Sequence, residues 1–95
     1  MVSERPDDVF LGLLASLQMS AWMALGKVTN PMTQKIERNM PQAKETIDLL
    51  GVLEDKTRGN LHADEARMLG HILYELRLNY VDELKRGELS PPPPS

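Results

Sequence analysis

An uncharged run of seventeen residues, Val9–Leu25, constrains this fold more than any other feature of the chain. Spaced at 100° per residue, as in a helix, the run has two unlike faces. The bulky face comprises Phe10, Leu14, Leu17, Ala21 and Leu25, widened by Leu11 and Trp22. The opposite face carries the small residues Gly12, Ser16, Ser20 and Ala24, flanked by Val9, Leu13, Met19 and Met23. A helix that is apolar on nearly every side must be buried on nearly every side.

The small-residue face has two interpretations that the sequence leaves open. It accommodates a neighbouring helix of the same chain, or it forms a seam between copies of the protein. For the second case, the candidate interface residues are Gly12, Ser16, Met19, Ser20 and Met23. We do not expect a transmembrane span, because a spanning helix needs about 20 apolar residues. Peripheral membrane association through this helix remains an alternative.

The length of the chain favours self-association. Its 95 residues make one domain near the small end of what stabilises a single core. So short a chain has few other elements with which to cover an almost wholly apolar helix. We therefore expect a homo-oligomer, most simply a homodimer, in which this helix packs within an oligomeric helical bundle.

The remaining pattern predicts an all-α fold with three main helices at about residues 7–25, 39–58 and 63–86. The last two are joined closely enough to form a helical hairpin. The predicted domain spans 7–87, between a flexible N-terminal arm at 1–6 and a flexible proline-rich tail at 88–95. Whether that tail is a ligand for another protein is left open.

Local signals place the helix ends. Gly26 and Gly87 are predicted stops for the first and third helices, and Gly59 follows the second. Asn39 is a favourable N-cap with Gln42 three residues later. The third helix is predicted to begin after His62, with Glu65 as its third residue.

Apolar residues at helical spacing predict the core. In the second helix they are Met40, Ala43, Ile47, Leu50 and Leu53, with Leu49 at the edge, and in the third Leu69, Ile72, Leu73, Leu76, Tyr80 and Leu84. Leu78 and Val81 lie off this stripe, as exposed single residues or as contacts to a second subunit. The connector at 27–38 is expected to cross the core surface, with Met32 or Ile36 turned inward.

Composition limits the classes of function. The absence of cysteine excludes disulfides, thiolate catalysis and cysteine-ligated metals. A net charge of −3 argues against a general nucleic-acid-binding protein. The start of the chain lacks the basic segment of a secretory signal, which indicates the cytoplasm.

Catalytic signatures are weak. His71 and Glu75 lie four apart, a spacing that metal sites use, but a closed site needs four ligands. The acidic pairs along the helices are sequence neighbours that point in different directions. Because the sequence also lacks a glycine-rich phosphate loop, we expect no enzyme activity, no cofactor and no metal.

One polar cluster suits a different function. Lys56, Arg58 and Asn60 lie where the second helix ends and the chain turns. Positive charge there complements the helix dipole, which is a sufficient structural reason for it. The alternative is contact with an anion or with RNA, extended by Arg77, Lys85 and Arg86 if they share a face with the cluster.

Two segments resemble the bacterial family called domain of unknown function 1844. They are Thr46–Leu61, with its Lys-Thr-Arg-Gly-Asn-Leu run, and Leu73–Val81. The opening helix from Phe10 to Gly26 is similar to the start of that family. The resemblance implies a cytoplasmic bacterial helical protein and supplies no catalytic residue. Our leading hypothesis is therefore a non-enzymatic, self-associating interaction or scaffold module. The alternatives are an accessory factor that contacts RNA or the ribosome, and a peripheral membrane protein.

Overall fold

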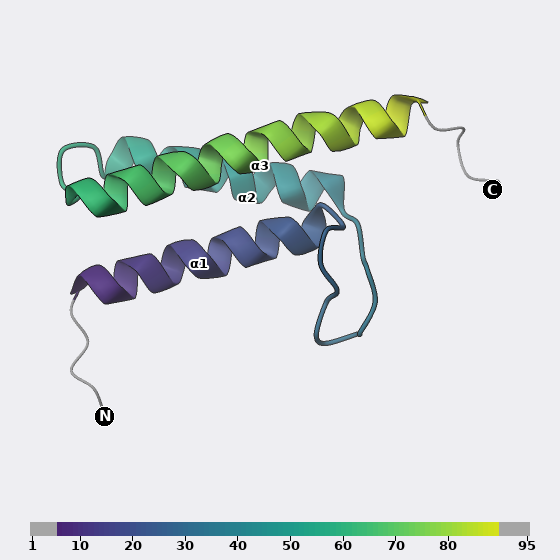
Figure 1. Cartoon of the computed structure of the whole chain (residues 1–95), viewed down its shortest axis with the longest axis horizontal. Coiled ribbons are helices and arrows are strands. Elements are labelled where there is room, and N and C mark those ends of the chain that lie inside the picture. Colours follow the sequence, from purple (N-terminus) through teal and green to yellow (C-terminus); the bar gives the residue numbers. More distant parts are fainter. Residues whose placement is uncertain (1–5, 90–95) are drawn as a thin grey trace.

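The computed structural model describes residues 6–89. This part of the chain contains three α-helices: α1 (Pro6–Ala24), α2 (Met40–Lys56) and α3 (Ala63–Leu89). Figure 1 shows that α1 and α3 run in the same direction, whereas α2 runs antiparallel to both. Each helix packs against the other two. The predicted all-α class, with three helices and a closing hairpin, is confirmed.

The core lies where the bulky faces of the three helices meet. Its buried members are Leu14, Ala21, Ala24, Leu25, Ala43, Ile47, Leu50, Leu69, Ile72, Leu73 and Leu76. The face of α1 predicted to be buried, from Phe10 to Leu25, packs into this cluster or against its edge. Two of the predicted residues are exposed: Leu84, near the end of α3, and Leu49, which was predicted at the edge of the core. Helical periodicity therefore predicts the side of each helix that is buried.

Gly26 ends α1 as predicted. Its φ of +79° is a left-handed conformation that costs a residue with a Cβ about 1–2 kcal/mol. Around it, the Lys27 N–H donates to the Trp22 carbonyl and the Gly26 N–H donates to the Met23 carbonyl, each at 3.0 Å. These two hydrogen bonds form a Schellman motif, which satisfies carbonyl groups at the end of the helix.

Replacing Gly26 by Ala is expected to lower the free energy of unfolding by about 1–2 kcal/mol, because alanine must adopt the same positive φ. Gly70→Ala is the matched control. Gly70 lies within α3, where an added Cβ would approach the Glu54 carboxylate no closer than 3.9 Å. That change should leave stability equal or raise it by up to about 1 kcal/mol. Urea unfolding measures both, and equal effects would contradict the assignment at Gly26.

Asn39 links the start of α2 to the end of α1. Its Oδ1 accepts a hydrogen bond from the Gln42 N–H at 3.1 Å, so the predicted N-cap is confirmed. The Asn39 N–H donates to the Ala24 carbonyl at 2.8 Å, whereas in a full capping box it would donate to the Gln42 side chain. This bond fixes where α2 begins relative to α1.

The connector between α1 and α2 extends away from the bundle (Figure 1). Met32 is 89% exposed and Ile36 is 60% exposed, so the prediction that one of them turns inward was wrong. The segment instead folds on itself: Asn30 and Lys35 form an isolated β-bridge, and the Asn30 Oδ1 accepts from the Met32 N–H at 2.8 Å. Local side-chain bonding of this kind holds a turn without any apolar anchor.

A buried carboxylate on α3 anchors the base of the connector. Glu83 accepts a hydrogen bond from Lys27 Nζ at 2.8 Å, and its Oε1 lies 3.5 Å from the Arg38 guanidinium. Arg38 also donates to the Glu83 backbone carbonyl at 2.7 Å. The pKa of Glu83 is lowered, mainly by the hydrogen bond from Lys27. Burial of the carboxylate raises the pKa, but the nearby positive charges of Lys27, Arg38 and Arg86 lower it further. The connector is thus held to α3 at both of its ends.

At its start, α3 follows the prediction. The Glu65 carboxylate accepts from the His62 N–H at 2.8 Å, which explains why an acidic side chain is buried there. The predicted stop at Gly87 was wrong, because α3 continues to Leu89. A single glycine weakens a helix by about 1 kcal/mol without ending it. Of the predicted arm and tail, Pro6 belongs to α1 and residues 88–89 belong to α3. The rest of both segments lies outside the described residues.

Candidate self-association surface

The outward side of α1 is apolar, uncharged and open. Val9, Leu13 and Met19 expose 57%, 45% and 51% of their surfaces, and Gly12 and Ser16 between them are exposed as well. A Cβ added at Gly12 would meet no atom within 4 Å. The side of α1 that carries the small residues is therefore the side that its own bundle leaves uncovered over this length.

This apolar surface continues from α1 onto α2. Ser20 of α1 and Gln42 of α2 line the same pocket, and the two helices run antiparallel. Leu13 lies two turns before Ser20 on α1, and Leu49 lies two turns after Gln42 on α2. Because the helices are antiparallel, Leu13 and Leu49 therefore occupy neighbouring positions. Val52 follows Leu49 by nearly one turn, and both side chains are about half exposed. We call these five residues, Val9, Leu13, Met19, Leu49 and Val52, the α1–α2 apolar face.

The interface residues predicted from the sequence divide into two groups. Met19 belongs to the α1–α2 apolar face, and Gly12 and Ser16 are exposed between its members on α1. Ser20 and Met23 are half-buried, because the connector passes beside them. The sequence pattern predicts Leu49 only at the edge of the core and assigns no role to Val52. Their exposed, apolar positions on one side of α2 become meaningful only once α2 is placed beside α1.

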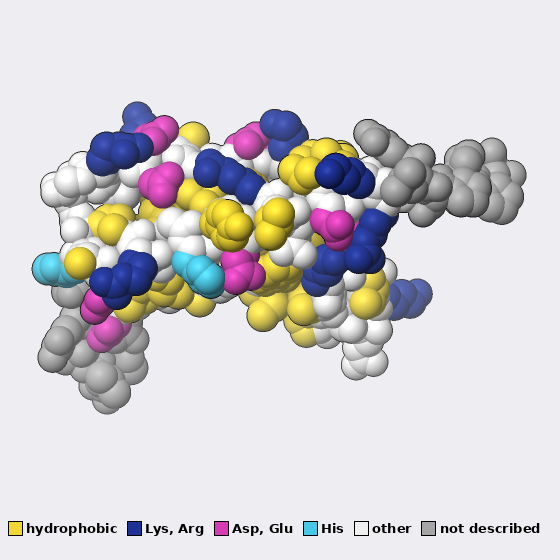
Figure 2. Space-filling view, turned by 45° about the horizontal axis from the view of Figure 1, so that its top comes forward, with side chains coloured by type: hydrophobic (Ala, Val, Ile, Leu, Met, Phe, Trp, Pro, Cys, Tyr) yellow, Lys and Arg dark blue, Asp and Glu magenta, His cyan; other side chains and the backbone are white. Residues whose placement is uncertain are grey.

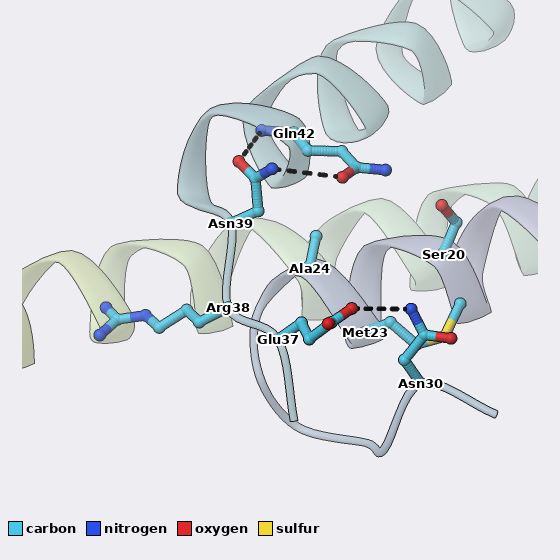
Figure 3. Close-up of a pocket in the computed structure, with 8 residues that line it drawn as sticks. All are labelled: Ser20, Met23, Ala24, Asn30, Glu37, Arg38, Asn39 and Gln42. Carbon is cyan, nitrogen blue, oxygen red and sulfur yellow. Dashed lines mark hydrogen bonds between the residues drawn. The ribbon is translucent and has the colours of Figure 1, made fainter. Parts of the chain in front are cut away.

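The connector closes the C-terminal end of this face with a pocket of about 340 Å³ (Figure 3). Its lining residues are Ser20, Met23, Ala24, Asn30, Glu37, Arg38, Asn39 and Gln42. Inside the connector, Asn30 Nδ2 donates to Glu37 Oε1 at 3.0 Å. The pocket is lined mainly by polar groups that already pair with one another, so it forms a boundary of the apolar face.

A second, smaller apolar surface lies on α3. Tyr74, Leu78 and Val81 are exposed and follow each other at spacings of four and three residues; we call them the α3 stripe. Figure 2 shows hydrophobic side chains in the middle of this surface with charged side chains around them. Beside the stripe, the Arg77 guanidinium lies against Gly51 of α2, since a Cβ there would be 3.0 Å from it. The α3 stripe is thus bordered by charge, unlike the open face of α1.

The Lys56–Asn60 corner does not form a basic patch. Lys56, Arg58 and Asn60 are exposed, but Arg58 pairs with Asp55 at 2.8 Å. The cations proposed to extend the cluster do not join it. The Arg77 guanidinium lies against Gly51, more than one turn of α2 before Lys56, and Lys85 and Arg86 lie about 33 Å or more along α3 from the start of that helix. The corner therefore concentrates little positive charge.

His71 and Glu75 contact each other on the surface of α3, with Nε2 and Oε1 3.0 Å apart. Within residues 6–89, no group of three or more histidine or acidic side chains is placed to hold a metal ion. None of the helices in that range is long and apolar enough to cross a membrane.

Comparison with known proteins identifies a family. A model described as Domain of unknown function (DUF1844) matches residues 8–82, which include all of α2, most of α1 and most of α3. Neither the curated proteins nor the solved structures gave a match.

Proposed function

The chain belongs to the DUF1844 family, whose description carries no activity, and we propose from its surface that the protein is a self-associating helical module, most simply a homodimer. The α1–α2 apolar face is the proposed contact surface. The observation that carries the proposal is that α1 leaves its outward side open although no charged residue occurs between Asp8 and Lys27. Surface helices normally present charged or polar side chains to water.

The size of the face suits association of moderate strength. Complete burial of a valine, leucine or methionine side chain contributes about 1.5–3 kcal/mol. Burying the exposed half of these five side chains would therefore contribute roughly 4–8 kcal/mol per copy. The contribution of two copies is roughly twice as large. Association itself costs about 4–15 kcal/mol, and a dissociation constant of about 1 μM corresponds to about 8 kcal/mol net. Only the upper part of the estimated gain reaches this value, so we expect a dissociation constant that is micromolar or weaker.

The alternatives have less support from the same residues. RNA contact through Lys56, Arg58 and Asn60 would draw on a corner in which Arg58 already pairs with Asp55. Peripheral membrane helices combine an apolar face with lysine or arginine that attracts anionic lipid. The sequence from Val9 to Gly26 contains neither residue. Self-association needs no charge, and a two-fold interface sets each residue near its own counterpart or another of the same surface.

Sedimentation velocity of the full chain over a range from below one to several hundred micromolar tests the proposal. We expect the weight-average mass to rise from one copy, 10.7 kDa, toward twice that value within this range. A mass of one copy at every concentration would overturn the proposal. A membrane role would then be examined with phosphatidylglycerol vesicles, and an RNA role with single-stranded RNA at low salt.

A further inference from the structure

We infer that the two copies place their α1 helices side by side and antiparallel at the two-fold axis, with Val9 of one copy opposite Met19 of the other. This inference rests on the proposed self-association and specifies its geometry. Three observations carry it: the distribution of charge over the α1–α2 apolar face, the position of the connector, and the order of exposed residues along α1.

Charge selects α1, rather than α2, for the axis. Charged side chains border Leu49 and Val52 on α2: Glu45, one turn before Leu49, and Lys56, one turn after Val52, are both exposed. A two-fold axis through α2 would take these charged groups out of water, which costs free energy that the uncharged face of α1 does not incur. The open face of α1 carries no charge, so two copies can approach there without repulsion. In that arrangement, the apolar residues of α2 flank the axis.

The connector selects the antiparallel direction. It extends from the C-terminal end of α1 and runs beside Ser20 and Met23 (Figures 1 and 3). Parallel α1 helices would bring both connectors to the same end of the dimer, where they would compete for the same space. Antiparallel helices place the connectors at opposite ends. The helix dipoles also then oppose each other, which is the favourable arrangement for neighbouring helices.

The exposed residues of α1 set the register. Val9, Gly12, Ser16 and Met19 follow one another at spacings of three, four and three, which read the same in both directions. Such spacing keeps all four on one seam of a paired helix. An antiparallel pair centred on residue 14 places Val9 opposite Met19 and Gly12 opposite Ser16, so the bulky residues meet at the ends and the small ones at the middle. This register also keeps the partner helix centred away from the connector.

Cysteine cross-linking tests the geometry directly, because the natural sequence contains no cysteine. In the proposed register, Val9 and its own counterpart lie about 15 Å apart along the helix axis, whereas a disulfide needs Cα atoms within about 7 Å. We expect Val9→Cys alone and Met19→Cys alone to cross-link slowly under mild oxidation. An equimolar mixture of the two variants should form disulfide-linked dimer at least about tenfold faster. Leu78→Cys, on the α3 stripe, is the control and should not cross-link.

The outcomes separate this inference from the proposed function. Rapid cross-linking of Val9→Cys with itself would indicate parallel helices and overturn the inference, while self-association through α1 would stand. Slow cross-linking of every combination, in samples that sediment as dimers, would place the axis elsewhere and overturn the inference as well. Samples that sediment as monomers at all concentrations would overturn the inference together with the proposed function. Circular dichroism of each variant establishes that its helices are intact.

Discussion

Replacing Leu13 by Glu is expected to weaken self-association at least about 100-fold, which corresponds to about 3 kcal/mol of uncompensated desolvation. In a single copy the Leu13 side chain is about half exposed, so the glutamate reaches water and the bundle remains folded. In the proposed dimer the same carboxylate lies in an apolar contact, where α1 provides no cation to pair with it. Sedimentation velocity measures the dissociation constant, and thermal unfolding verifies the fold.

Leu78→Glu is the matched control for this prediction. It introduces the same charge on a leucine of similar exposure, 58% against 45%, but on the α3 stripe. We expect its dissociation constant to equal that of the natural protein. Weakened association of Leu78→Glu, together with unchanged association of Leu13→Glu, would move the interface to α3 and contradict the assignment to the α1–α2 apolar face.

Replacing Glu83 by Gln is expected to lower the free energy of unfolding by about 1.5–3 kcal/mol at pH 7, the usual worth of hydrogen bonds to a charged group. Glutamine keeps the volume of the side chain but removes the negative charge that Lys27 and Arg38 share. The expected loss is large because Glu83 is buried and its partners hold the connector to α3.

The effect of this substitution should depend on pH. The pKa of Glu83 in the folded protein lies below its ordinary value of about 4.5, so the carboxylate releases its proton more readily when folded. Its contribution to stability is then fully present above about pH 4.5 and is lost as the pH falls through the lowered folded-state pKa. The difference in stability between the natural protein and Glu83→Gln should therefore shrink below pH 4.5. A difference that stays constant from pH 7 to pH 3 would contradict this role for Glu83. Glu75→Gln, at the more exposed contact with His71, is the control and should change stability by less than about 1 kcal/mol.

The features predictable from the sequence are those decided within a few residues. Asn39 caps α2 and Gly26 ends α1, because each needs only its local backbone and side chain. The buried side of α1 was also predictable, since a helical spacing fixes which residues share a face. Gly87 misled the prediction because a glycine stops a helix only when the following residues favour another conformation.

The features missed by sequence reasoning depend on how the helices are placed. Leu49 and Val52 join the face of α1 only because α2 runs antiparallel beside it (Figure 1). The connector was expected to pack on the core, but its own Asn30 turn and the contacts of Arg38 decide its direction. Glu83 did leave a signal in the sequence. It lies seven residues after Leu76, on the core side of α3, and a carboxylate in such a position requires cationic partners from elsewhere in the chain.

Oxidation of the methionines by excess hydrogen peroxide, followed by mass spectrometry of peptides, tests the burial of α1 between copies most directly. Met19 lies in the α1–α2 apolar face, and Met32, on the exposed connector, serves as an internal reference in the same sample. As the protein concentration rises from below one to several hundred micromolar, we expect oxidation of Met19 to slow several-fold while that of Met32 stays constant. Rates at both methionines that do not change with protein concentration would contradict self-association through α1.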